Sequence, residues 1–176
     1  MKIYPVAEKI NLLDLAPPIP GFEQFIGCYV IGGKKVALVD VGPSSCSQNL
    51  IRGLAKLGIT PMDVEYIFIT HIHIDHAGGL GKILAATPRA KVVVHGKAKR
   101  HLINPKKLWQ GSKKVLGELA DKYGVIYPVP EERILTPNEG ETFKLNGDTE
   151  LEVLFTPGHA PHHLSFIERR RGIVSW

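Results

Sequence analysis

The stretch "FITHIHIDHAGGL", residues 68–80, follows an apolar run and places four metal-binding side chains within six positions: His71, His73, Asp75 and His76. His71 and His73 are two residues apart, so in an extended segment both side chains point to one face. The next two side chains are adjacent in sequence, and the glycine pair after them indicates that the chain turns there. The four side chains therefore form two pairs aimed at neighbouring points. Such pairs suit two metal ions bound by imidazole nitrogens and a carboxylate oxygen.

A second histidine cluster lies in "FTPGHAPHHLSF", residues 155–166, behind another expected strand. Its Pro-Gly turn places His159 where it can complete a three-histidine site with the first pair, leaving one position for water as in a catalytic zinc site. For His162 and His163 two interpretations stay open. Each can bind metal directly, or it can orient a ligand through a hydrogen bond or packing.

Moving outward from the motif, residues 64–70 are nearly continuous in apolar side chains, which is typical of a strand buried on both faces. Residues 24–42 predict a β-hairpin, and the segment after it has leucines at helical spacing up to Gly58. On the other side of the motif we expect a helix over residues 79–86, a strand over 90–95, and helix through 106–124.

The pattern then changes to hairpins over residues 141–156, with a tight turn at Asn146-Gly147, and over residues 163–176 around a basic turn. No repeat, low-complexity tract or change of composition divides the chain. We therefore expect a single domain over residues 1–176, of the α/β class, with helices covering sheets.

Charge and cysteine content restrict the partners. Lys and Arg number 22 against 17 Asp and Glu, a net charge of +5, and part of the excess is clustered in residues 96–107 and 168–172. These clusters could attract an anionic substrate or RNA. A solvated surface is the interpretation we favour, because no aromatic residues are interleaved as in nucleic-acid binding sites. Cys28 and Cys46 lack CxxC spacing and are expected to be buried thiols.

The compartment and the assembly are predicted more coarsely. No run is apolar enough for a signal peptide or a bilayer span, so we expect a cytoplasmic protein with no membrane partner and a small-molecule substrate. A homo-oligomer stays open, since unfinished sheets and apolar loops favour pairing.

Three segments in this order resemble the sequence elements of the metallo-β-lactamase superfamily: "ALVDVGP" (37–43), "THIHIDHAGG" (70–79) and "TPGHAPHHLSF" (156–166). The resemblance covers essentially the whole chain and is nearest to the stand-alone metal-dependent hydrolases of bacteria and archaea. It implies an αββα sandwich with the metals at one edge, between the two sheets.

The resemblance also implies roles for individual residues. The first metal would be bound by His71, His73 and His159, and the second by Asp75 and His76. Asp40 matches a residue that supports the site through hydrogen bonds, and we assign the same role to His163. The metal implied is Zn²⁺, two ions in the complete protein, with Fe or Mn as alternatives.

Members of the family normally place an Asp that bridges both metals in a Gly-Asp pair after a strand like residues 172–176. No Asp or Glu follows Glu168 here, and no His follows His163. We therefore expect that the C-terminal part of the fold is missing from this chain, with Trp176 inside the last strand. The missing Asp would be a ligand of the second metal, so its absence affects the occupancy of that metal site and the activity of this chain by itself.

The expected reaction is hydrolysis of an ester-like bond by a metal-bound hydroxide, on a lactone, thioester or other ester. Asp75 is the expected catalytic residue, because it would ligate the second metal and help to hold the nucleophile. Candidates for the substrate pocket are His101, Trp109 and Tyr127. The alternatives are a mononuclear iron oxygenase resembling the persulfide dioxygenases of this fold and a non-catalytic metal-binding remnant.

Overall fold

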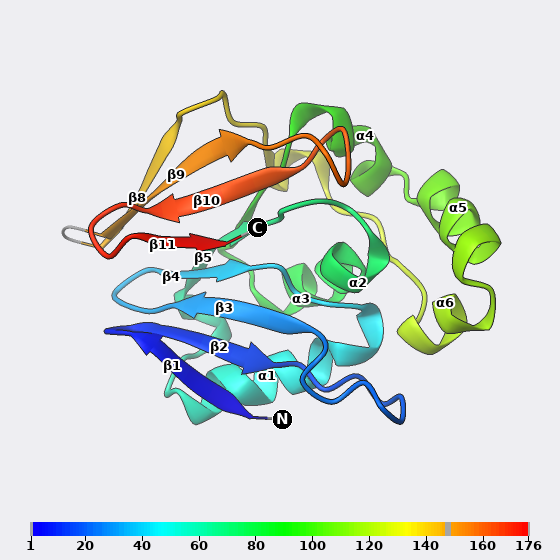
Figure 1. Cartoon of the computed structure of the whole chain (residues 1–176), viewed down its shortest axis with the longest axis horizontal. Helices are drawn as coiled ribbons and strands as arrows, with labels where there is room; N and C mark the ends of the chain where they lie inside the picture. Colours follow the sequence, from blue (N-terminus) through cyan, green and yellow to red (C-terminus); the bar gives the residue numbers. More distant parts are fainter. Residues whose placement is uncertain (1, 147–148, 176) are drawn as a thin grey trace.

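The computed structural model describes residues 2–146 and 149–175, and its strands form two sheets that lie face to face (Figure 1). Seven of the described strands form the larger sheet in sequence order: β1 (Ile3–Ala7), β2 (Ile10–Asp14), β3 (Gly27–Ile31), β4 (Val36–Val39), β5 (Val64–Phe68), β6 (Lys91–Val93) and β7 (Ile134–Leu135). The strands from β1 to β4 pair antiparallel, and those from β4 to β7 pair parallel.

The smaller sheet holds four described strands in the order β11-β10-β9-β8, all antiparallel: β8 (Thr142–Asn146), β9 (Thr149–Phe155), β10 (Leu164–Glu168) and β11 (Ile173–Ser175). Both expected hairpins of this region are thus confirmed. The expected tight turn at Asn146-Gly147 includes Gly147, which lies outside the described residues.

The helices lie between the strands of the larger sheet in the chain: α1 (Ser47–Lys56), α2 (Ile74–Ala77), α3 (Leu80–Ala86), α4 (Gly96–Ile103), α5 (Lys106–Leu116) and α6 (Glu118–Tyr123). Three 3-10 turns accompany them in the described residues: η1 (Ser44–Cys46), η2 (Pro61–Asp63) and η3 (Glu131–Arg133). None of the helices within residues 2–146 and 149–175 is long and apolar enough to cross a bilayer.

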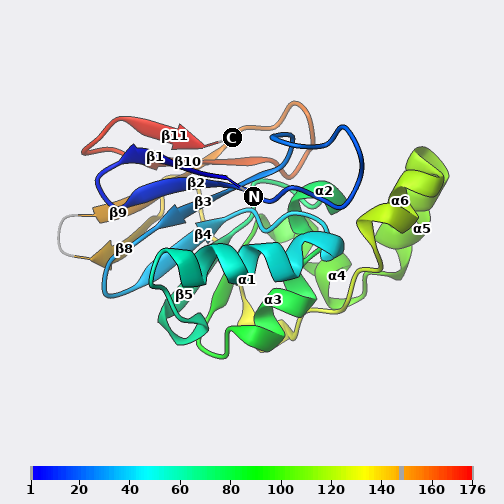
Figure 2. The same cartoon turned by 90° about the horizontal axis from the view of Figure 1, so that it is seen from below.

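Two apolar cores hold the layers together. One lies between the sheets, where Phe68 of β5 packs edge-on against Phe143 of β8 and Phe166 of β10, with ring centroids 5.3 and 5.1 Å apart. The other lies between the larger sheet and its helices, where Leu50 and Leu54 of α1 are fully buried. Figure 2 shows α1 and α3 on one side of the larger sheet and the smaller sheet on the other. The predicted α/β layered class is confirmed.

The sequence patterns located most of these elements, but they did not indicate β1 and β2. Each of these strands has five residues, and β1 contains Pro5. Proline cannot donate to a strand ladder and occurs on edge strands, which is where β1 lies. Strand β2 pairs antiparallel with β3, and this pairing between separate segments of the chain stabilises the strand conformation of β2.

Candidate metal centre

The candidate centre lies where loops from both sheets meet at one edge of the sandwich. Asp40 directly follows β4, and the segment from Thr70 to His73 follows β5. Since β4 and β5 are parallel, their carboxyl ends reach the same edge. The loop between β9 and β10 brings His159 from the smaller sheet, and the Leu164 amide donates to the Thr70 carbonyl at 2.8 Å, which joins the two sheets beside the site.

Three histidines form the cluster that the sequence predicted for the first metal. His71, His73 and His159 each present a ring nitrogen, and these nitrogens lie within 4.8 Å of one another. The His159 Nε2 and His73 Nδ1 atoms are 3.0 Å apart. His71 is buried, whereas the other two are exposed toward solvent. Imidazole nitrogens converging at the edge of a rigid sheet form the donor set that zinc and related divalent ions prefer.

Hydrogen bonds fix which nitrogen of His71 is free. The Thr70 hydroxyl donates to Asp40 Oδ2 at 2.8 Å, so it can only accept from His71 Nδ1, 3.0 Å away. His71 therefore carries its proton on Nδ1 and keeps the lone pair of Nε2. Among the described residues this Nε2 atom is buried and has no hydrogen-bond partner. A buried acceptor without a partner costs free energy, and a bound cation would satisfy it.

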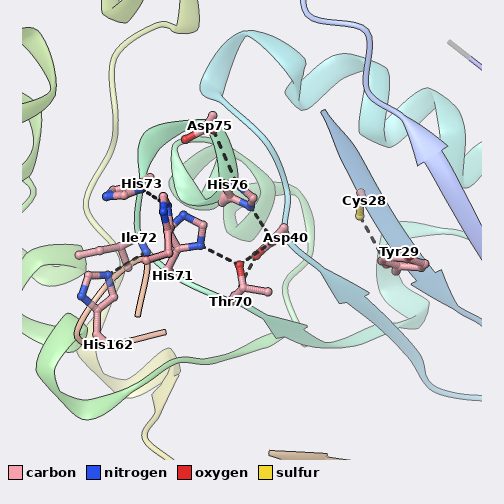
Figure 3. A network of polar contacts seen from close by, with 11 residues as sticks. Cys28, Tyr29, Asp40, Thr70, His71, Ile72, His73, Asp75, His76 and His162 are labelled. Carbon is pink, nitrogen blue, oxygen red and sulfur yellow. Dashed lines mark hydrogen bonds and ion pairs between the residues drawn. The ribbon is translucent and has the colours of Figure 1, made fainter. Parts of the chain in front are cut away.

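Asp75 and His76 form the second pair, on the short helix α2 that begins after His73 (Figure 3). The Asp75 Oδ2 and His76 Nε2 atoms are 3.6 Å apart, and the His71 and His76 ring centroids are 4.2 Å apart. His76 Nδ1 donates to Asp40 Oδ2 at 2.8 Å. The second nitrogen of His76 and the Asp75 carboxylate therefore lie side by side, next to the three-histidine cluster, as expected of ligands to a second ion.

Burial and neighbouring charges give the histidines different proton affinities. Burial, followed by the nearby histidines, lowers the pKa of His71 to about 2 and lowers that of His73. Burial alone would also lower the pKa of His76, but the hydrogen bond to Asp40 and the charges of Asp40 and Asp75 raise it overall. His71 and His73 are thus neutral at physiological pH, which is the form that binds metal.

His163 and His162 lie beside the cluster and make different contacts with it. The His163 ring stacks on that of His71 with centroids 5.1 Å apart, and its Nδ1 lies 2.9 Å from the Thr156 hydroxyl. His162 Nε2 accepts the Ile72 amide at 3.2 Å and so holds the backbone between His71 and His73. Both contacts match the orienting role that the sequence left open for the pair.

A cavity of about 760 Å³ opens beside the cluster, with His73, Asp75 and His159 at one end. Of the expected pocket residues, His101 lines it. Trp109 packs against the helix-side core and Tyr127 lies beside Lys82, so neither contributes to the cavity wall.

Several residues around the centre escaped the sequence reasoning. Thr70 precedes the motif and gives no signal of its own, because its role depends on Asp40 thirty positions earlier. Lys97 and Arg100, expected on a solvated basic face, line the cavity together with Lys107. Their spacing of three on one helix face was the available signal.

The family model of the metallo-beta-lactamase superfamily matches residues 23–175. The metallo-beta-lactamase fold-containing protein ST1585 of Sulfurisphaera tokodaii is 33% identical over 151 residues, which are 83% of this chain and 54% of that protein. The N-acyl homoserine lactonase AttM of Agrobacterium fabrum is 30% identical over 122 residues, 69% of this chain and 42% of that protein.

Among solved structures, the subclass B3 metallo-beta-lactamase BJP-1 of Bradyrhizobium japonicum superposes with a TM-score of 0.73 at 26% identity, over 94% of this chain and 56% of that one. The chain spans about half the length of the curated relatives it matches.

Proposed function

The chain belongs to the metallo-beta-lactamase superfamily, and on this basis we propose that it acts as a zinc-dependent hydrolase of an ester-like bond. The observation that carries the proposal is the convergence of His71, His73 and His159, with the Nε2 lone pair of His71 buried and unpaired among the described residues. The relative named as a lactonase acts on a cyclic ester, which supports an ester-like substrate here.

The donor set fits a divalent ion, and His71, His73 and His159 would hold it. With zinc bound by these residues, the pKa of a coordinated water would be lowered and the carbonyl oxygen of a substrate would be polarised. Thr70 and Asp40 keep His71 in the tautomer that leaves Nε2 free, so binding requires no proton transfer on that ring. These contacts orient the ligand before substrate arrives.

Asp75 and His76, next to the three-histidine cluster, would contribute ligands of their own. Both would hold a second ion, and Asp75, which lines the cavity, would also accept a hydrogen bond from the attacking water and so orient it. His76 is held in place by Asp40. In this proposal Asp40 is a positioning residue, because it touches the ligands rather than the substrate.

The test measures bound metal and hydrolysis in the same protein. Purified protein should contain zinc by elemental analysis and should cleave members of a panel of lactones, thioesters and aryl esters. His71→Ala should lose the metal and reduce turnover at least a hundredfold. His95→Asn is the matched control. His95 caps α4 by accepting the Lys97 amide, and Asn preserves that acceptor, so metal content and activity should stay unchanged.

Two results would overturn the proposal. Iron in place of zinc, with oxygen consumed on a persulfide, would identify the oxygenase chemistry of this fold instead. Wild-type metal content in His71→Ala would remove the cluster from metal binding altogether.

A further inference from the structure

Helices α4 and α5 contribute no residue to the metal cluster, but both line the cavity beside the candidate centre. Helix α5 contributes Leu108, Gly111, Ser112, Val115 and Leu116, which recur at helical spacing and so form one stripe. None of the residues of α5 is buried, and Val115 is 82% exposed. In Figure 1, α5 extends outward on the side of the molecule away from β8 and β11. Leu108 and Leu116 also pack partly against the helix-side core, and Val115 is the exposed apolar side chain of the stripe. The side of the stripe that faces the cavity is a surface that an apolar ligand can cover.

The same cavity carries a concentrated positive charge. Lys97, Arg100 and His101 of α4 line it, and Lys107 at the start of α5 joins them. Their proximity is visible at His101, where burial and then the charges of Arg100 and Lys107 lower the pKa of the imidazole. Among the described residues lining the cavity, Asp75 is the one carboxylate, and it stands at the metal end.

Two lysines on these helices that do not line the cavity have carboxylate partners. Lys99 on α4 pairs with Glu131 at 3.0 Å, and Lys113 on α5 pairs with Asp121. In contrast, within residues 2–146 and 149–175 none of the three long cations that line the cavity, Lys97, Arg100 and Lys107, has a carboxylate at ion-pair distance. Their charge is therefore available to a ligand.

We propose that the substrate carries both an apolar chain and an anionic group. The apolar chain would lie along the stripe of α5, and the anionic group, a carboxylate or a phosphate, would lie between Lys97, Arg100 and Lys107. This inference rests on the proposed hydrolase function, since the ester-like bond must reach His73, Asp75 and His159 at the other end. The cavity of about 760 Å³ has the size of sites for small organic ligands.

Binding of unreactive probes tests the inference independently of catalysis. Hexanoate, hexyl phosphate and hexanol share one apolar chain and differ in charge, and their affinities can be compared by NMR titration of the protein. The two anions should bind about tenfold more tightly than hexanol and shift amide signals of α4 and α5. The order of hexanoate and hexyl phosphate identifies the preferred anionic group.

Variants assign the effect to the cavity. Arg100→Gln and Lys107→Gln, on different helices, should each weaken binding of the anions about threefold and leave hexanol binding unchanged. Lys99→Gln and Lys113→Gln change the net charge equally on the same two helices but remove paired lysines, so they should leave all three affinities unchanged. Equal affinities for anions and hexanol, or equal losses in all four variants, would overturn the inference.

A coordinated metal could also attract an anion. Removal of the metal by a chelator separates this attraction from that of Lys97, Arg100 and Lys107. After zinc is removed, the preference for the anions should persist and still depend on Arg100. If the preference disappears with the metal and Arg100→Gln has no effect, the inference is wrong. Absence of ester hydrolysis with intact, Arg100-dependent anion binding would instead contradict the proposed function alone.

Discussion

At the scale of single residues, Asp40 connects the two halves of the candidate centre. Its carboxylate accepts the amide and the hydroxyl of Thr70 and the Nδ1 proton of His76, at 2.8 to 2.9 Å. Through Thr70 it orients a histidine of the first cluster, and through His76 a histidine of the second pair (Figure 3). Asp40 adopts a left-handed backbone conformation with φ of 56°, which is unfavourable for a residue other than glycine. Strain retained at this position is consistent with a functional constraint on where the carboxylate lies.

The hydroxyl of Thr70 is expected to control metal affinity. Thr70→Val keeps the side-chain shape but removes the acceptor for His71 Nδ1, so the imidazole loses its preferred tautomer and orientation. The zinc affinity should fall about tenfold, measured by competition with a chelator. Thr70→Ser keeps the hydroxyl and should keep the affinity. An unchanged affinity in Thr70→Val would show that the relay does not matter for binding.

His162 is expected to make stability depend on pH. Burial, followed by neighbouring histidines, lowers its pKa from 6.5 to about 4. Between pH 7 and pH 5 the unfolded chain gains a proton on this ring while the folded protein does not, so stability falls as the pH falls. His162→Gln still offers an acceptor to the Ile72 amide but does not titrate. In the presence of EDTA, its free energy of unfolding should fall by about 1 kcal/mol less than that of the wild type over this range, after allowance for solvent screening.

Urea unfolding at the two pH values provides the measurement. His162→Ala serves as the comparison, because it removes the acceptor of the Ile72 amide and should be less stable than His162→Gln at both pH values. Identical pH dependence in the wild type and His162→Gln would contradict the assignment.

At the scale of elements, the loop after β4 and helix α2 hold each other in place. The amides of Val41 and Gly42 both donate to the His76 carbonyl at 3.0 Å, and the Gly79 amide donates to the Gly42 carbonyl at 2.8 Å. The backbone of α2 is thus fixed to the loop that begins at Asp40, directly after β4. Helix α2 spans only Ile74–Ala77, so these bonds and the packing around it, rather than helix propensity, determine where Asp75 and His76 lie.

Gly42 tests this junction. Its φ is 71°, and a Cβ atom there would lie 2.5 Å from Cδ1 of Leu15, which is fully buried and cannot move aside. Gly42→Ala should lower the free energy of unfolding by about 2 to 3 kcal/mol, from backbone strain plus overpacking. Gly140→Ala is the matched control, since φ is 76° there and nothing lies within 4 Å of the added atom. It should cost only about 1 kcal/mol, and equal losses in the two variants would exclude the packing contribution.

The sequence predicted the elements whose signal is local. The strand before the motif, the helix after it and the two hairpins of the smaller sheet follow from continuous apolar runs, helical periodicity and turn residues. Five candidate metal ligands could be named because four of them lie within six positions and the fifth follows a Pro-Gly turn. The Asp40–Thr70–His71 relay and the contact between His162 and Ile72 join residues 30 and 90 positions apart, and no local pattern encodes such distances. The cavity wall formed by α4 and α5 could not be predicted for a similar reason. Helical periodicity identifies an apolar face, but it does not distinguish a face that covers a core from one that borders a cavity.

At the scale of the whole molecule, the contact between the two sheets depends on aromatic packing. Phe68 and Phe166 are almost completely buried and meet edge to face across the interface. Such pairs add to the stabilisation that comes from burial of apolar area. The four-stranded sheet contributes His159 to the candidate centre, so the position of that residue depends on this interface.

Phe166→Ala should lower the free energy of unfolding by about 3 to 5 kcal/mol, because it leaves a cavity between the sheets. Phe25→Ala removes the same side chain where it is 66% exposed, beside Phe22, and should cost no more than about 1 kcal/mol. Urea denaturation of the two variants and the wild type gives the comparison. A loss in Phe166→Ala as small as that in Phe25→Ala would mean that the sheets do not depend on this contact.

The origin of the three clustered histidines from opposite sheets has a consequence for the life of the protein in a cell. His71 and His73 follow β5 of the larger sheet and His159 lies in the loop between β9 and β10 of the smaller one, so an ion held by all three would bridge the two layers. If the proposed metal is bound there, its release and the separation of the layers are thermodynamically linked, and a drop in the free metal would weaken the fold by mass action. Starvation for the metal would therefore lower the abundance of the protein through faster turnover of opened molecules, in addition to any loss of activity.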